Sequence, residues 1–207
     1  MFKKSHTKFL AILLSVWGMF ALSASALTAK EKQTLEFLAS EFNKVSTVKA
    51  NFSQTSSRGG SASGRLLMSR PGKMRMQYDT PVSDAALIVN SGVTLWWEAG
   101  KKRNIPTGQT PIKAMVQKNF SFFDNDIKIL DYNESGNNVS VTMQWKPRPQ
   151  DGYLTVTMTK NKPVVIKGWS MSDTDGNVVN INLSNIQFGV SAPNKYFQVN
   201  TPVSWPK

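Results

Sequence analysis

The sequence has no cysteine and only one histidine, His6, among its 207 residues. Cysteine and histidine are the usual ligands of structural zinc, and they supply the usual nucleophile or base of covalent hydrolases. His6 lies in a segment that we expect to be removed, so neither group remains in the folded protein. This excludes a Ser-His-Asp triad, a Cys-His pair, a His/Cys zinc site and any disulfide. We expect no metal and no cofactor.

Long uncharged apolar runs are missing from the chain, except at its beginning. Residues 1–8 hold three lysines and no acid, and residues 9–22 form an uncharged apolar run. Small residues at Ala24 and Ala26 follow, so the segment has the three parts of a signal peptide that is cleaved near Ala26. A membrane anchor is the alternative, but the apolar run is shorter than the ~20 residues that a bilayer span needs. We predict a single periplasmic domain over residues 27–207.

Acidic residues are few: 13 Asp and Glu face 25 Lys and Arg, a formal charge of +12. Removing the three lysines of residues 1–26 leaves 22 bases against 13 acids, a net charge of +9. The bases are scattered, and the longest run is Lys101-Lys102-Arg103. In an exported protein this pattern argues against nucleic-acid binding. It suits transient contact with anionic lipid headgroups or acidic partners, and a plain solubility role is equally open.

One helix is predicted at the start of the mature chain. Thr28 and Glu31 have the spacing of a capping box, with Thr28 as N-cap and Glu31 at the third helical position. Apolar residues then recur at three- and four-residue steps, which places them on one face of a helix from about 29 to about 45. They are Leu35, Leu38, Phe42 and Val45. Phe37 lies off this face and is not explained by it.

Almost everything after this helix has the pattern of β-strands. Apolar and polar residues alternate over residues 139–146, 153–159, 73–78 and 178–188, as in an antiparallel sheet with one dry face. Turn signals such as Pro71-Gly72 separate the runs at short intervals. The pattern predicts a mainly β fold of about ten or eleven strands. They run over roughly 48–56, 63–70, 73–78, 85–90, 93–98, 102–106, 126–134, 139–146, 153–159, 164–172 and 178–188.

Residues 107–123 interrupt the strands because they lack alternation. Pro111 suits the first position of a short helix behind Thr110 as cap. Ile112, Met115 and Val116 then share one helical face. A helix of about 17 residues is ~25 Å long and ~10 Å wide, so the opening helix alone cannot cover the broad apolar face of such a sheet. We expect the two helices to act as plug and lid over an apolar cavity.

Methionine is unusually common in the predicted strands, where β-branched residues are the rule. Its flexible, polarisable side chain suits a surface that accepts apolar ligands of variable shape, although ordinary core packing is the alternative. The residues that we expect to line the cavity are Leu66, Met68, Met74, Met76, Tyr78, Trp96, Met143 and Trp145.

Arg70 ends an apolar row, because it shares strand parity with Gly64, Leu66 and Met68. A charge that faces a dry surface must be paired or hydrogen-bonded. The guanidinium group offers five donors, which suits backbone carbonyls. A strand-end arginine turned out to solvent is the other interpretation, and the pattern leaves both open.

Four segments together carry a family resemblance. They are residues 48–55 (VKANFSQT), residues 64–75 (GRLLMSRPGKMR), residues 89–96 (VNSGVTLW) and Thr110-Pro111-Ile112. In this order they resemble the LolA-type periplasmic lipoprotein carriers of Gram-negative bacteria. The resemblance implies an incomplete, unclosed antiparallel β-barrel with helices forming a lid over a hydrophobic cavity. It implies that Arg70 holds the lid closed through hydrogen bonds to lid backbone, and that Met74 takes the position of a cavity aromatic that contacts cargo.

The resemblance also implies a function and partners. Such carriers are not enzymes; they take acylated lipoproteins from an inner-membrane ABC release complex and pass them to an outer-membrane receptor of similar fold. That receptor is lipidated through an N-terminal cysteine, which this chain lacks, so we expect the soluble carrier and a monomer. The chain departs from the family through an apparent insertion at Ser83 to Ala86, through Met at positions 74 and 76, and through its basic charge.

Two other function classes remain open at this level. A periplasmic sensor or adaptor could bind a lipid or glycolipid without moving it. An enzyme could use paired carboxylates, and Asp124 and Asp126 are the candidates on a predicted loop.

Overall fold

The computed structural model describes residues 26–80, 85–90, 92–98, 100–106 and 112–198. The predicted signal peptide, the predicted insertion around Ser83 and the helix-start residues Thr110 and Pro111 lie largely or wholly outside these ranges. The helices are α1 (Ala29–Asn43), α2 (Ile112–Val116), η2 (Pro149–Asp151) and η3 (Asn194–Phe197). The strands are β1 (Thr47–Ser56), β2 (Ser61–Ser69), β3 (Lys73–Thr80), β4 (Ala86–Asn90), β5 (Val93–Glu98), β6 (Lys101–Pro106), β7 (Ile127–Ser135), β8 (Asn138–Trp145), β9 (Tyr153–Thr159), β10 (Ile166–Ser172) and β11 (Val178–Phe188).

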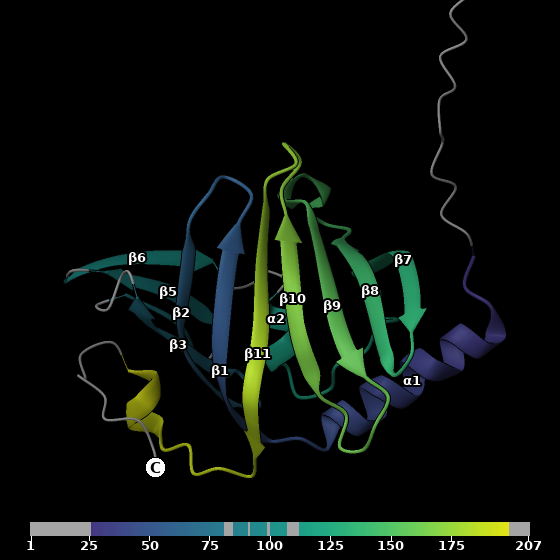
Figure 1. The fold of residues 1–207 in the computed structure, drawn as a ribbon, viewed down its shortest axis with the longest axis horizontal. Coiled ribbons are helices and arrows are strands. Elements are labelled where there is room, and N and C mark those ends of the chain that lie inside the picture. The colour runs from purple at the N-terminus through teal and green to yellow at the C-terminus, as the bar shows by residue number, and fades with distance from the viewer. Residues whose placement is uncertain (1–25, 81–84, 91, 99, 107–111, 199–207) are drawn as a thin grey trace, which may run out of the picture.

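The strands form one antiparallel sheet of eleven strands in the order β6-β5-β4-β3-β2-β1-β11-β10-β9-β8-β7. Two meanders therefore meet where β1 pairs with β11. The sheet curves but does not close, since β6 and β7 form its two edges (Figure 1). This confirms the predicted fold class, an unclosed antiparallel barrel with few helices.

Helix α1 begins where the sequence predicts. The Thr28 side chain accepts from the Glu31 N–H, and the Glu31 carboxylate accepts from the Thr28 N–H at 2.7 Å. The helix ends at Asn43, two residues before the predicted end, because the chain turns there to enter β1. Phe37, which the helical pattern does not explain, packs partly against the core, and the Lys162 ammonium lies 5.5 Å from its ring centroid.

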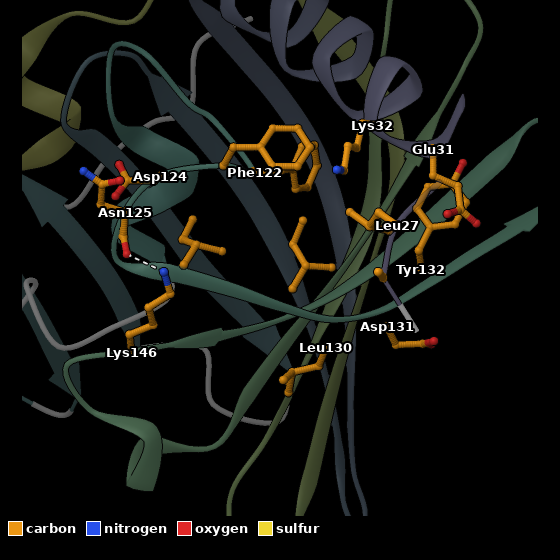
Figure 2. A pocket seen from close by; sticks show the side chains of 14 residues that line it. Leu27, Glu31, Lys32, Phe122, Asp124, Asn125, Leu130, Asp131, Tyr132 and Lys146 are labelled. Carbon is orange, nitrogen blue, oxygen red and sulfur yellow. Dashed lines mark hydrogen bonds between the residues drawn. The ribbon is translucent and has the colours of Figure 1, made fainter. Parts of the chain in front are cut away.

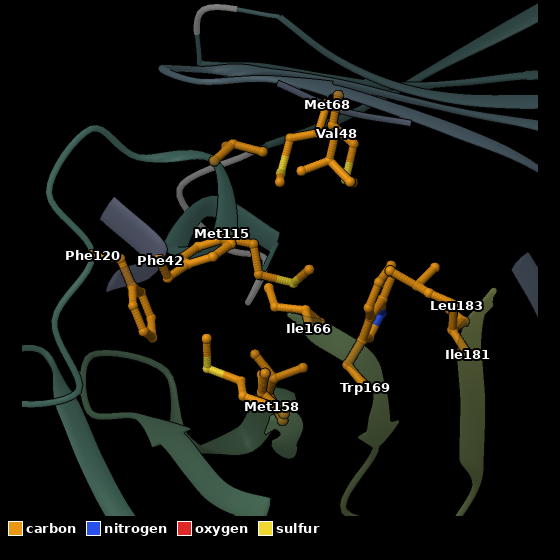
Figure 3. Close-up of a cluster of buried hydrophobic side chains, with 14 of the residues drawn as sticks. Phe42, Val48, Met68, Met115, Phe120, Met158, Ile166, Trp169, Ile181 and Leu183 are labelled. Atoms are coloured by element: carbon orange, nitrogen blue, oxygen red, sulfur yellow. The ribbon is translucent and has the colours of Figure 1, made fainter. Parts of the chain in front are cut away.

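The main core lies on the concave side of the sheet, where α2 is seen behind β10 and β11 (Figure 1). The alternating residues of β8 and β9 face it as predicted: Val141, Met143, Leu154 and Val156 are buried there. Figure 3 shows side chains from α1, α2 and both halves of the sheet meeting in this core. Helices and sheet therefore share one continuous apolar interior.

A second, smaller core lies on the other side of the sheet, where η3 covers Leu67 with Tyr196 and Phe197. Arg75 of β3 holds η3 against the sheet through hydrogen bonds. It is 4% exposed, and its Nη1 donates to the carbonyls of Tyr196 and Gln198 at 3.2 Å each. The Arg75 Nη2 also donates to Gln77 Oε1 at 2.7 Å. Burial lowers the pKa of Arg75.

Replacing Arg75 by Met should weaken the whole fold, because the buried Tyr196 carbonyl and the Gln198 carbonyl both lose a charged donor. We expect Arg75→Met to lower the free energy of unfolding in urea by about 3 kcal/mol. Arg58→Met is the matched control, since the Arg58 side chain is 68% exposed, and its effect should stay within about 0.5 kcal/mol. Equal effects of the two substitutions would contradict the anchoring role of Arg75.

Candidate functional site

Arg70 follows β2 and enters the space between the ends of two helices. Its backbone N–H donates to the Ser46 carbonyl at 2.7 Å, which fixes the start of the side chain beside the turn from α1 to β1. Next to it, the Gly72 N–H donates to the Val116 carbonyl at 2.6 Å and ties the same turn to the end of α2. Backbone hydrogen bonds of this turn therefore connect it both to the segment after α1 and to the end of α2, independently of the Arg70 side chain.

On the α1 side, the guanidinium group binds the C-terminal end of the helix. Arg70 Nη1 donates to the carbonyls of Phe42 at 2.6 Å and Val45 at 3.3 Å, and Nη2 donates to Asn43 Oδ1 at 2.8 Å. Cζ lies 4.2 Å from the centroid of the Phe42 ring. Carbonyls at a helix C-terminus lack helical partners and carry partial negative charge, so a cation is favoured there.

On the α2 side, the same guanidinium group binds the residues that follow the helix. Arg70 Nε and Nη2 donate to the Gln117 carbonyl at 3.1 and 2.8 Å, and Nη2 reaches the Lys118 carbonyl at 3.3 Å. Burial lowers the pKa of Arg70 to about 10, so the group stays charged at neutral pH. Arg70 therefore bridges two segments that are separated by some seventy residues in the chain.

Asn43 makes a second bridge that the sequence analysis missed. Its Nδ2 donates to the Phe120 carbonyl at 2.9 Å, and its Oδ1 accepts from the Phe120 N–H at 2.9 Å as well as from Arg70. Phe120 also packs edge-on against Phe42, with 5.8 Å between the ring centroids. An asparagine near a helix end is a common local signal for helix termination, so the sequence offers no sign of this distant contact.

Beneath the bridged helices lies an apolar cavity of about 20 Å³, room for about one water. The sequence predicts an apolar cavity without fixing its size. In the structure side chains fill most of the space, because flexible residues such as Met68 and Met115 extend into it. The cavity is lined by Phe42, Val48, Leu66, Met68, Met115, Val164, Val165, Ile166, Trp169, Leu183, Ile186 and Phe188.

The predicted site residues fall into three groups. Leu66, Met68 and Met115 line the cavity. Five others are buried in the same core without lining it: Met74, Met76, Tyr78, Val116 and Met143. Trp96 and Trp145 are partly buried and pack against the core. Pro111 lies outside the described residues, and Ile112 is described only as the first residue of α2.

Tyr78 joins the core to a polar partner. Its hydroxyl donates to Gln54 Oε1 at 2.9 Å, and burial raises the pKa of Tyr78 to about 12. Its ring lies edge-on between Phe52 and Trp96, with centroid distances of 5.1 and 5.4 Å. These rings fill the part of the barrel near β3 and β5.

A more open hollow of about 630 Å³ lies beside edge strand β7 and the start of α1 (Figure 2). Charged side chains, among them Glu31, Lys32 and Asp131, share its wall with apolar ones. Lys146 Nζ donates to the Asn125 carbonyl at 2.7 Å within it. Such mixed walls suit an acyl chain poorly, because the charged groups would lose water on burial.

The carboxylates considered for catalysis shape a turn in this region. Asp124 Oδ1 accepts from the Asp126 N–H at 3.0 Å, which is the ordinary role of an aspartate at the start of a tight turn. Within the described residues there is no group of three or more His, Cys, Asp or Glu side chains that could hold a metal. The same part of the chain contains no helix that is long and apolar enough to cross a membrane.

An unclosed antiparallel sheet, with two helices fastened across its apolar side by one arginine, defines an open-barrel protein whose interior is closed by helices. The chain belongs to the LolA family: residues 43–200 match the family model described as "Outer membrane lipoprotein carrier protein LolA".

Individual relatives agree with this assignment. An outer-membrane lipoprotein carrier protein of Pseudomonas putida (strain W619) is 24% identical over 204 residues, covering 92% of this chain and 93% of its own. One from Chromobacterium violaceum is 27% identical over 169 residues, covering 75% and 78%. The crystal structure of an outer membrane lipoprotein-sorting protein domain from Vibrio parahaemolyticus has a TM-score of 0.52 at 10% identity, covering 79% and 95%, and shows likeness of fold alone.

Removing the Arg70 side chain should loosen the helices while leaving the sheet intact. In Arg70→Leu we expect hydrogen exchange at the amides of α2 and Phe120 to rise by about tenfold or more, because several charged hydrogen bonds are lost. The amides of β9 should keep their protection. Arg148→Leu is the control, since Arg148 pairs with Asp151 at 2.8 Å near η2, away from the helices. Unchanged exchange in α2 would show that Arg70 does not hold it.

Proposed function

We propose that this protein is a non-enzymatic periplasmic carrier that binds the acyl chains of lipoproteins in its interior and moves them from the inner to the outer membrane. The observation that carries the proposal is the Arg70 bridge, which closes two helix ends over an apolar interior. Membership of the family and the printed names of the relatives support it. The partners would be acylated lipoproteins, an inner-membrane ABC release complex and an outer-membrane receptor. The protein would act as a monomer.

In this proposal Arg70 is a latch and α2, with Met115 and Val116, is the moving lid. A cavity of about 20 Å³ cannot hold an acyl chain, so loading requires the lid to lift and the methionines to repack. The latch must be weak enough to open. Each hydrogen bond contributes roughly 0.5–3 kcal/mol net, whereas each buried methylene contributes about 0.8 kcal/mol. Ten methylenes contribute about 8 kcal/mol, which lies inside the range of about 3–18 kcal/mol for the hydrogen bonds of Arg70. The several acyl chains of one lipoprotein can therefore together offset the loss of the latch.

The same balance explains release. An acylated lipoprotein cannot cross water unaided, because its chains favour a membrane or an apolar pocket strongly. A carrier whose closed, empty state is stabilised by the latch holds cargo less tightly than an always-open one. The exposed run Lys101-Lys102-Arg103 at edge strand β6 is a suitable surface for transient attraction to anionic headgroups or acidic partners.

The direct test is to identify what the protein holds in the periplasm. We expect native mass spectrometry of protein purified without detergent to detect intact acylated lipoproteins. Recovery of only free glycolipid or phospholipid would instead favour a sensor or adaptor that binds lipid without moving lipoproteins. A parallel assay should load the protein with a triacylated lipoprotein and measure its transfer to outer-membrane vesicles, which we expect to occur. Lipoprotein that stays bound to the protein would contradict the carrier function.

Truncating one buried methionine of the cavity wall should increase acyl binding. Met115→Ala enlarges the cavity beneath α2, so we expect tighter binding of a fluorescent fatty acid together with a stability loss of roughly 2–5 kcal/mol. Met143→Ala is the matched control, because Met143 is as deeply buried but lies outside the cavity wall. It should lose similar stability without tighter binding. Equal gains in binding would place the acyl site elsewhere.

A further inference from the structure

Trp169 is turned into the interior by an irregularity in β10. The pairing of β10 with β9 shifts register between Ile166 and Gly168, so that Trp169 pairs with the inward residues Val156 and Ile181. Gly168 permits the close strand approach, since a Cβ there would lie 2.2 Å from the Ile181 carbonyl oxygen. Ile166 and Trp169 are three residues apart, so in a regular strand their side chains would point to opposite faces of the sheet. Here both are buried. The bulge therefore places an indole ring in the cavity wall.

The indole N–H of Trp169 is buried and has no hydrogen-bond partner. The residue is 3% exposed, and Figure 3 shows its ring between Ile166 and Leu183. Buried tryptophans usually find an acceptor for this group. Trp96, by comparison, donates to Glu98 Oε2 at 3.1 Å. The Trp169 indole N–H is thus a buried donor without an acceptor in an otherwise apolar wall.

The wall limits what can accept that hydrogen bond. All twelve residues that line the cavity are apolar, and the Trp169 indole carries the one polar side-chain atom among them. A buried water needs two to four polar partners, which these side chains do not supply. A hydroxyl group would bring a donor of its own that finds no side-chain acceptor, and a phosphate would lose its hydration. Carbonyl and ether oxygens both accept hydrogen bonds without bringing a donor, and the carbonyl oxygen is the stronger acceptor of the two. A neutral carbonyl oxygen therefore satisfies the indole N–H best.

We infer that the Trp169 indole N–H binds the carbonyl oxygen of an ester- or amide-linked acyl chain, and that Trp169 selects such chains over ethers and hydrocarbons. The inference rests on the proposed acyl-carrying function and specifies the class of ligand. The carbonyl marks the head of every ester-linked acyl chain, so its capture also fixes how deep the chain enters. Trp169 is a specificity and positioning residue.

The test compares a diacylglycerol with its dialkyl ether analogue of the same chain length. We expect the wild-type protein to bind the ester about three- to tenfold more tightly, the effect of one neutral hydrogen bond. Trp169→Phe keeps an aromatic ring but loses the N–H, so it should bind the two ligands equally, with ether affinity near that of the wild type. Trp96→Phe is the matched control and should keep the preference for the ester.

A second measurement needs no variant. In the wild-type protein, the indole N–H proton resonance of Trp169 should move further downfield on loading with the ester than with the ether, because the carbonyl oxygen is the stronger acceptor. Equal affinity of the wild type for both ligands, or an equal shift with both, would overturn the inference while leaving acyl carriage standing. Binding of neither ligand would overturn the proposed function together with the inference.

Discussion

The closed interior depends on one half-buried guanidinium group, that of Arg70. Arg70 meets carbonyls from the ends of α1 and from the residues after α2, which are groups that no helix can satisfy by itself. Burial lowers its pKa to about 10, well above neutral, so the charge persists where it is needed. Without this charge, the two helix ends would face each other with partial charges of the same sign and no cation between them.

Arg75, which is 4% exposed and so more deeply buried than Arg70, makes its contacts on the other side of the sheet. Arg75 ties η3 to β3, and an apolar cluster around Leu67 backs this contact. Arg70 ties elements whose closure leaves flexible methionines and a small cavity beneath them. Apolar packing therefore holds both sides of the sheet. On the side that faces the helices, the hydrogen bonds of Arg70 join the two helix ends in addition to this packing.

The empty state carries costs that a ligand can relieve. Methionine side chains give up rotamer freedom to fill the interior, and the indole N–H of Trp169 goes without an acceptor. An acyl chain with a carbonyl at its head would free the methionines to repack and would satisfy the indole. Under the proposed function, the Arg70 latch would oppose loading and these two contributions would favour it, so that the carrier could both take up and release cargo.

The sequence by itself determined the strands and the start of α1, because alternation and the Thr28–Glu31 capping box act between near neighbours in the chain. It also singled out Arg70, through the apolar row that the residue ends. Only the tertiary structure decided that Asn43 meets Phe120, that η3 covers Leu67, and that a bulge turns Trp169 inward. The physical reason is that burial and hydrogen-bond pairing depend on which distant segments come into contact, and the local periodicity of the sequence does not determine those contacts.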